Sequence, residues 1–167
     1  MSHPSVLVVC HANQFRSPLC AAAMRRAAPS LVIASAGVKP GLREGRAASA
    51  KVREVALGNH ALAYEWYSVA CTKPLLDAHD VVVYMDGGNL QRLRELRVDE
   101  SRLVSLGDYC LPPRRRIADP AFMARGSDDL QDICRTIVEA SERLALWLIA
   151  ERPSAGQAHS QEKGNHS

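Results

Sequence analysis

The residues best suited to chemistry lie close to the N-terminus, in the segment Cys10-His11-Ala12-Asn13-Gln14-Phe15-Arg16-Ser17. An apolar, β-branched run at residues 5–9 precedes the cysteine and a helix-like stretch follows the arginine, so the segment should be a loop between a strand and a helix. Backbone N–H groups of such a loop can point at a dianion near the helix N-terminus, and Arg16 can hold two phosphoryl oxygens. The same positive field favours the thiolate form of Cys10, which is the form that attacks phosphorus. The pattern therefore predicts nucleophilic attack on a phosphoryl group.

Other residues of this segment are expected to support that chemistry. Ser17 is placed to donate a hydrogen bond to the sulfur of Cys10, and Asn13 to brace the loop from within. Because the loop turns its N–H groups inward, the imidazole of His11 should point away from the phosphate. The predicted substrate-binding residues of the loop are His11, Ala12, Asn13, Gln14 and Phe15. A purely structural interpretation stays open, in which a buried cysteine ends a strand and a serine caps a helix.

Transfer of a phosphoryl group from an ester also needs an acid for the leaving oxygen, and Asp119 is the candidate. Pro120 follows it, biases it to an extended shape and keeps it off any helix, so the carboxyl can project toward the loop. The alternative is an ordinary turn, in which Asp-Pro is common. Asp108 is the second candidate acid. Asp86 is expected to cap the helix that begins near Gly88, with Asn89 bracing neighbouring backbone.

The elements that must position these residues alternate along the chain. Short apolar runs at residues 5–9, 31–36, 81–85 and 102–106 predict strands, and helical spacing predicts helices at residues 17–28, 45–57, 88–96 and 127–150. Alternation of this kind predicts a doubly wound α/β fold, with a parallel sheet of about four strands, helices on both faces and a phosphate-binding loop after the first strand. Ligands bind such sheets at the carboxyl ends of the strands, where Cys10 lies.

Composition limits the function classes. The 167 residues form one predicted domain at residues 1–150 and a disordered polar tail at residues 151–167, and the net charge of +3 is too small to indicate nucleic acid as a partner. No signal sequence or apolar span is evident, so we expect a cytoplasmic protein without membrane insertion. The five cysteines, at positions 10, 20, 71, 110 and 134, have no metal-like or paired spacing, so reduced thiols and no metal or cofactor are expected.

The chain resembles the low-molecular-weight protein tyrosine phosphatases, whose loop reads Cys, any residue, Gly or Ala, Asn, two residues, Arg, Ser, Pro after the first strand. The segment from Cys10 to Pro18 fits this pattern at five positions, Cys10, Asn13, Arg16, Ser17 and Pro18. Further matches follow later strands, at Ser35-Ala36-Gly37, at Met85-Asp86 with Asn89-Leu90, and at Leu106-Gly107-Asp108-Tyr109. The resemblance implies a phosphocysteine intermediate on Cys10, and places the general acid and base at Asp119.

The chain also departs from the family pattern at the expected walls of the site. Phe15 occupies the place where many members have a second loop cysteine, which leaves Cys20 as the nearest other thiol, expected mainly to pack. Trp66 to Val69 stand where the family has a His followed shortly by an Arg. Phe122 follows the Asp-Pro where many members have tyrosines. Phe15, Trp66 and Phe122 are the candidates for binding substrate at these walls, although for the neighbouring aromatic residues Tyr64, Trp66 and Tyr67 simple packing in the domain is the favoured expectation.

The predicted function is hydrolysis of a phosphomonoester, with phosphotyrosine in a protein as the main candidate. The partner is thus a phosphorylated protein or a small phosphomonoester, while the oligomeric state stays open. Three alternatives on the same fold are an arsenate reductase, a small-metabolite phosphatase and a non-catalytic phosphate-binding module. The arginines at residues 114–116 can steer an acidic or phosphorylated partner, or can form an ordinary solvated loop.

Overall fold

A four-stranded parallel sheet forms the centre of the computed structural model, which describes every residue except 1, 48–49, 51–52, 55–66, 123–126 and 152–167. The strand order is β2-β1-β3-β4. The strands are β1 (Ser5–Cys10), β2 (Val32–Gly37), β3 (Val81–Tyr84) and β4 (Leu103–Ser105). The predicted α/β fold with its parallel sheet is confirmed.

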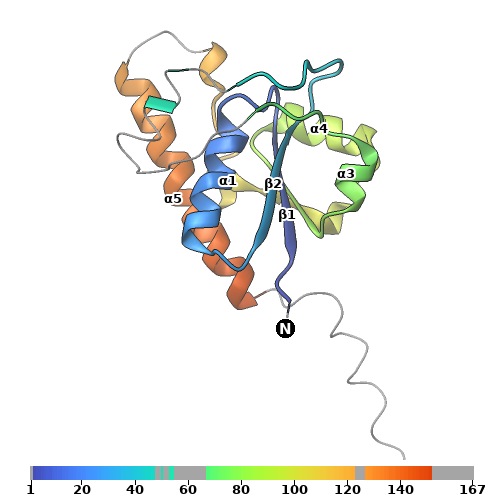
Figure 1. Cartoon of the computed structure of the whole chain (residues 1–167). Coiled ribbons are helices and arrows are strands. Elements are labelled where there is room, and N and C mark those ends of the chain that lie inside the picture. The colour runs from blue at the N-terminus through green and yellow to red at the C-terminus, as the bar shows by residue number, and fades with distance from the viewer. Residues whose placement is uncertain (1, 48–49, 51–52, 55–66, 123–126, 152–167) are drawn as a thin grey trace, which may run out of the picture.

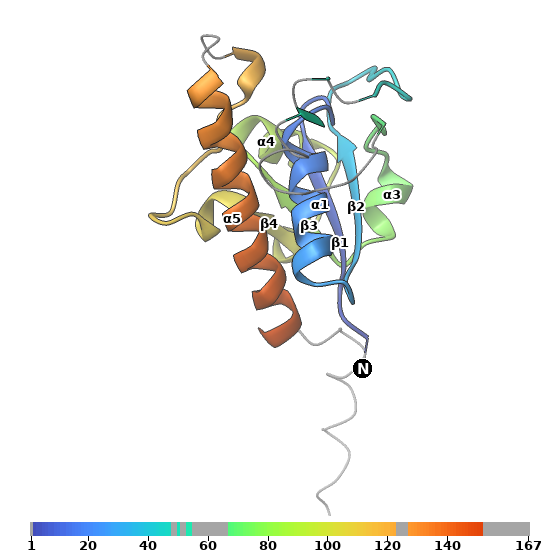
Figure 2. The same ribbon diagram turned by 60° about the vertical axis from the view of Figure 1, so that its left-hand side comes forward.

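Both faces of the sheet are covered, as the unbroken apolar run of β1 requires. Val6 and Val8 pack into one core cluster with residues of α1 (Arg16–Ala27) and α5 (Ser127–Glu151). Leu7 and Val9 point the other way, toward a second cluster with Leu76 of α3 (Lys73–Asp77) and Leu93 of α4 (Gly87–Glu95). Figures 1 and 2 show α1 and α5 side by side on one face and α3 and α4 on the other.

The strand order places Cys10 at the point where the topology reverses. The chain moves from β1 to β2 on one side of the sheet and then crosses to β3 on the other side. The helices that follow β1 and β2 therefore leave the sheet in opposite directions, and a crevice opens at the carboxyl ends of these strands. Cys10 is the last residue of β1 and therefore lies at this end of the sheet.

Two expectations about the helices need correction. The predicted helix at residues 45–57 does not begin at Gly45, which has a φ of +74°, because the backbone of Gly45 and Arg46 is hydrogen-bonded to Ser68. Ala47 forms an isolated bridge to Tyr67, Ala50, Arg53 and Glu54 are helical, and residues 48–49, 51–52 and 55–57 lie outside the described residues. The short helix α3 was not predicted, although Thr72 caps it and Pro74 lies in its first turn.

The C-terminal helix α5 corresponds to the last predicted helix, at residues 127–150. The apolar positions Cys134, Ile137, Leu144 and Leu148 of α5 are fully buried, as helical spacing predicted. Glu151, the first residue of the predicted tail, ends α5, and residues 152–167 lie outside the described part of the chain. Among the helices that the structure describes, none has the length and hydropathy that crossing a membrane requires.

Candidate functional site

The loop after β1 is braced by Asn13, which is fully buried and has a φ of +52°. Its side-chain amide donates hydrogen bonds to Ser17 Oγ at 2.8 Å and to Ser35 Oγ at 3.0 Å. Its carbonyl oxygen accepts a hydrogen bond from the backbone N–H of Val69 at 2.8 Å. Asparagine is one of the few residues that tolerate this left-handed backbone. One side chain therefore fixes the loop to the start of α1, to β2 and to the segment around Val69.

The loop also needs a glycine opposite it, at the end of β2. Gly37 is the register partner of Cys10, and a Cβ built at Gly37 would lie 3.0 Å from the carbonyl carbon of Ala12 and 3.0 Å from the amide nitrogen of Asn13. Only a residue without a side chain permits this approach. The match at Ser35-Ala36-Gly37 thus has two structural reasons, a hydroxyl for Asn13 and space for the loop.

Ser17 approaches the candidate nucleophile directly. Its Oγ lies 3.1 Å from the Sγ of Cys10, which is 3% exposed. Because Asn13 donates to this Oγ, the serine hydroxyl keeps its own hydrogen for another acceptor. The Cys10 sulfur at 3.1 Å is closer than the Ala36 carbonyl oxygen at 3.4 Å. The geometry suits stabilisation of a thiolate by a neutral donor.

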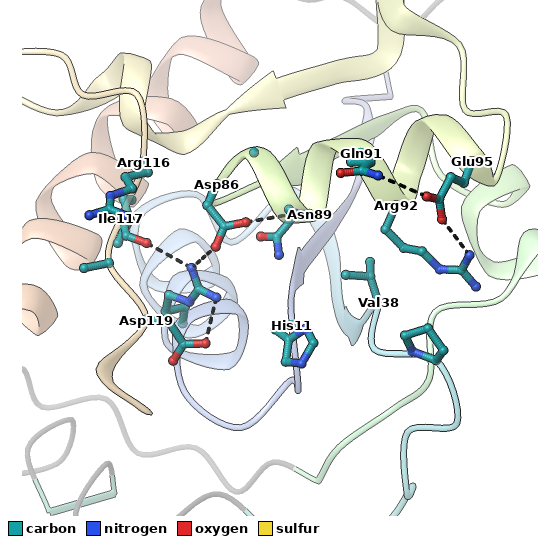
Figure 3. Close-up of a pocket in the computed structure, with 15 residues that line it drawn as sticks. His11, Val38, Asp86, Asn89, Gln91, Arg92, Glu95, Arg116, Ile117 and Asp119 are labelled. Carbon is teal, nitrogen blue, oxygen red and sulfur yellow. Dashed lines mark hydrogen bonds and ion pairs between the residues drawn. The ribbon is translucent and has the colours of Figure 1, made fainter. Parts of the chain in front are cut away.

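Arg16 has the largest fully buried side chain of the residues that the structure describes, and it holds the site together. Its Nη1 donates to Asp86 Oδ2 at 2.7 Å and to the Ile117 carbonyl oxygen at 2.9 Å, and its Nη2 donates to Asp119 Oδ2 at 3.1 Å. Figure 3 draws these three contacts around the guanidinium. A guanidinium carries one N–H on Nε and a pair on each Nη. After these contacts, the N–H on Nε and one N–H on Nη2 remain for an anion. These two form the edge that grips two oxygens of a phosphoryl group.

The two carboxylates on Arg16 are held in different ways. Asp86 Oδ1 accepts a hydrogen bond from the Asn89 N–H at 2.8 Å and so caps α4, as predicted, while Asn89 Oδ1 braces the Met85 N–H. Burial raises the pKa of Asp86, but the hydrogen bonds from Arg16 and from the Asn89 amide outweigh it and bring the pKa below its ordinary value. The second role of Asp86, as a partner of Arg16, was not predicted.

Asp119 combines the two interpretations that its sequence left open. Its Oδ1 accepts a hydrogen bond from the Ala121 N–H at 3.0 Å, which is the turn expected of an Asp-Pro pair, and the short 3₁₀ helix Pro120–Phe122 follows. Its Oδ2 nevertheless faces Arg16, and its side chain is 21% exposed. Asp108, the second candidate acid, is exposed and does not line the cleft.

Arg16, Asp86 and Asp119 line a cleft of about 730 Å³. These three residues form one end, and the other end reaches Val38, Pro40 and the α4 residues Arg92 and Glu95. His11 also lines this cleft, as Figure 3 shows. In the described residues, no three His, Cys, Asp or Glu side chains gather into a metal-binding group.

A family model described as low molecular weight phosphotyrosine protein phosphatase matches residues 5–155. The chain belongs to this family. The family and its structural neighbours are phosphatases, so the predicted resemblance and the predicted enzyme class are confirmed. No curated protein sequence matches the chain.

Three solved structures illustrate the likeness. YfkJ from Bacillus subtilis is 24% identical with a TM-score of 0.79, covering 92% of this chain and 99% of its own. The tyrosine phosphatase Wzb from Escherichia coli K30 is 25% identical with a TM-score of 0.75, covering 87% of this chain and 99% of its own. The YwlE arginine phosphatase from Geobacillus stearothermophilus is 24% identical with a TM-score of 0.74, and the match covers 98% of this chain and 99% of the YwlE chain.

The departures from the pattern of this phosphatase family can now be placed. Phe15 is 9% exposed, packs in the core and does not line the cleft. Where the His and Arg of the family are missing, the backbone N–H of Val69 braces Asn13, so this loop contact needs no particular side chain. Trp66 lies outside the described residues, as does the side chain of Phe122. Tyr67 is 56% exposed, so packing, the favoured expectation for it, is wrong.

The other loop residues and thiols take structural places. Gln14 donates to the Arg46 carbonyl oxygen at 3.0 Å, and Ala12 is half-buried. Cys20 is fully buried beside Met24, and burial is the main cause that raises its pKa to about 12. All five cysteines are free thiols.

Proposed function

We propose that this phosphatase hydrolyses phosphomonoesters, with phosphotyrosine in proteins as its main substrate, through a phosphocysteine intermediate on Cys10. The observation that carries the proposal is the position of Arg16, the first residue of the helix that follows the Cys10 loop, whose guanidinium lies 3.1 Å from Asp119. One buried cation thus joins an anion-binding edge to a candidate acid, at the start of the helix that follows the candidate nucleophile. A module that only bound phosphate would have no use for the acid.

In the first step, the thiolate of Cys10 attacks phosphorus opposite the leaving oxygen. The S–P bond forms while the P–O ester bond breaks, and Asp119 transfers its proton to the departing oxygen. The free edge of Arg16 and the loop amides hold the equatorial oxygens, where negative charge spreads in the transition state.

In the second step, water attacks the phosphocysteine. Asp119, now a carboxylate, takes a proton from this water, and the S–P bond breaks to release inorganic phosphate and the thiolate of Cys10. The hydroxyl of Ser17, at 3.1 Å from the sulfur, stabilises the thiolate both before the attack and after its release.

The experiment that tests this mechanism is hydrolysis of a generic aryl phosphate and of a phosphotyrosine peptide, with a chelator present. We expect turnover by the wild type and none by Cys10→Ser. Asp119→Asn should lower kcat on the peptide by about 10²- to 10⁴-fold, and less on an aryl phosphate with a good leaving group. Activity that survives in Cys10→Ser, or that disappears with the chelator, would overturn the proposal.

The choice of substrate is tested by the same assay with other phosphoryl compounds. Wzb is described as a tyrosine phosphatase and YwlE as an arginine phosphatase, so phosphotyrosine and phosphoarginine peptides should be compared with small phosphomonoesters. We expect the highest kcat/KM for phosphotyrosine. The free thiols favour action in the cytoplasm, where cysteines stay reduced.

A further inference from the structure

A basic loop lies beside the cleft and has no partner in the catalytic proposal. Residues 111–116 are all exposed and include three consecutive arginines, Arg114, Arg115 and Arg116. Among the described residues, these arginines form no ion pair and donate no side-chain hydrogen bond. Figure 2 shows this yellow-to-orange segment projecting beyond α5, and Figure 3 places Arg116 at the edge of the cleft, next to Ile117.

Both ends of this basic loop are fixed. The Arg114 N–H donates to the Gly107 carbonyl oxygen at 2.8 Å, and a Cβ at Gly107 would lie 2.1 Å from the Arg114 carbonyl oxygen, so only glycine allows this contact. The Ile117 N–H donates to the Met85 carbonyl oxygen at 2.8 Å, and the Ile117 carbonyl accepts from Arg16. The backbone that carries the arginines is therefore ordered before a partner binds, which lowers the entropic cost of binding.

The distance from the basic loop to the phosphate-binding edge suits the residues next to a phosphorylated side chain. An extended chain advances at most about 3.6 Å per residue, so the Cα atoms of residues 114–116 lie within about 11 Å of Ile117. Ile117 itself is bound to Arg16. A substrate peptide in extended conformation also advances about 3.3 Å per residue, so residues within about three positions of the phosphorylated one can reach the arginines.

The charges near the basic loop favour an acidic partner. The two carboxylates of the site, Asp86 and Asp119, form their ion pairs with Arg16 and not with the arginines of the loop. We propose that Arg114, Arg115 and Arg116 select protein substrates that carry Asp or Glu beside the phosphorylated residue. The proposal rests on the proposed function, because it extends the substrate specificity of the same site.

The test compares two phosphotyrosine peptides of equal length, one with three acidic residues on each side of the phosphotyrosine and one with the matching amides. Each exposed ion pair between the loop and the peptide should raise the affinity for the peptide by about 1.4- to fivefold. Two or three such pairs should therefore give the wild type about a tenfold preference in kcat/KM for the acidic peptide. The double variant Arg115→Gln/Arg116→Gln, which keeps Arg114, should reduce this ratio to about twofold. Raising the salt concentration to about 0.5 M should reduce it as well.

A matched control removes two positive charges elsewhere. Arg26 and Arg135 are exposed, lie on α1 and α5, and do not line the cleft. The variant Arg26→Gln/Arg135→Gln should keep the preference for the acidic peptide. Equal loss of preference in both double variants would mean that only the net charge matters, and would overturn the proposal, as would a wild type without preference.

Failure of the proposed function can be distinguished from failure of this inference. If neither peptide is hydrolysed, the affinities of the same two phosphopeptides for the Cys10→Ser variant test the basic loop independently of catalysis. Tighter binding of the acidic peptide that is lost when Arg115 and Arg116 are changed supports the basic loop as a recognition surface, and equal binding overturns it. Binding of phosphatidylserine vesicles that depends on these arginines, without any peptide preference, would assign the loop to a membrane surface instead and overturn the proposal.

Discussion

Replacing Gly37 by alanine should damage the phosphate-binding loop more than the rest of the fold. The added methyl group would lie 3.0 Å from the Ala12 carbonyl carbon and 3.0 Å from the Asn13 amide nitrogen, and 2.8 Å from Leu42 Cδ2. The leucine can rotate away, but the two backbone atoms cannot. Since ordinary contacts of a Cβ begin at 3.4 Å, the loop must move by at least about 0.4 Å.

The end of β2 cannot absorb this movement easily. The Gly37 N–H donates to the Val69 carbonyl oxygen, and the next residue, Val38, donates to the Cys10 carbonyl oxygen, at 2.8 and 2.9 Å. The shift therefore passes to Asn13 and the amides around it. A displacement of about 1 Å in a catalytic group can cost about 10²-fold in rate, so we expect kcat/KM to fall by about ten- to a hundredfold. Overpacking typically costs about 1–3 kcal/mol in the free energy of unfolding.

The assay measures kcat/KM for an aryl phosphate together with the melting temperature. Gly87→Ala is the matched control, because a Cβ at Gly87 meets no atom within 4 Å and the residue begins α4. Gly87→Ala should retain most of the activity and gain about 0.4–1 kcal/mol in stability. If a folded Gly37→Ala protein stays within about twofold of this control, the close approach of β2 to the loop is not what the loop requires.

The remaining predictions concern charge and burial. The lowered pKa of Asp86 adds stability that is fully present above about pH 4, the ordinary range of an aspartate, and that is lost as pH falls through the folded pKa. In urea titrations, the difference in unfolding free energy between wild type and Asp86→Asn should therefore hold from pH 6 down to about pH 4 and shrink at lower pH, and a constant difference down to about pH 3 would contradict the assignment. Because burial raises the pKa values of Cys20 and Cys134 to about 12, both should resist iodoacetamide at pH 8 until the protein unfolds. Mass spectrometry checks this, and rapid labelling of either thiol in the native protein would contradict it.

The sequence was sufficient to predict contacts between residues that lie close together along the chain. The apolar run of β1, the loop and the start of α1 are contiguous, so the approach of Ser17 to Cys10 and the bracing by Asn13 followed from spacing alone. The cap of α4 by Asp86 has the same local origin, since its partner is three residues away. The strand boundaries were predicted within one or two residues, because strands buried on both faces are continuous apolar runs.

Contacts between distant segments could not be predicted in this way. Arg16 meets Asp86 and Ile117 only because the order of the strands brings the ends of β1 and β3 together, and sequence spacing contains no distance across a sheet. Tyr67 was expected to pack because it is aromatic, yet it is 56% exposed in a segment bridged to Ala47. Residue type alone does not tell which side of such a segment faces solvent.

The two carboxylates on Arg16 explain how one buried cation can be stable without a ligand and still accept one. An unpaired buried charge is costly, so a guanidinium with 2% exposure needs carboxylate partners. Asp86 is held at both oxygens, by Arg16 and by the first turn of α4, so its removal would disturb the helix as well. Asp119 is held by Arg16 and by one amide of a short turn, and it contacts only Nη2, on the edge that a phosphoryl group would use. An incoming dianion can therefore bind the remaining N–H groups on Nε and Nη2 while Asp86 keeps Nη1 in place. The carboxyl of Asp119 then lies beside the bound phosphoryl group, where an acid for the leaving oxygen is required.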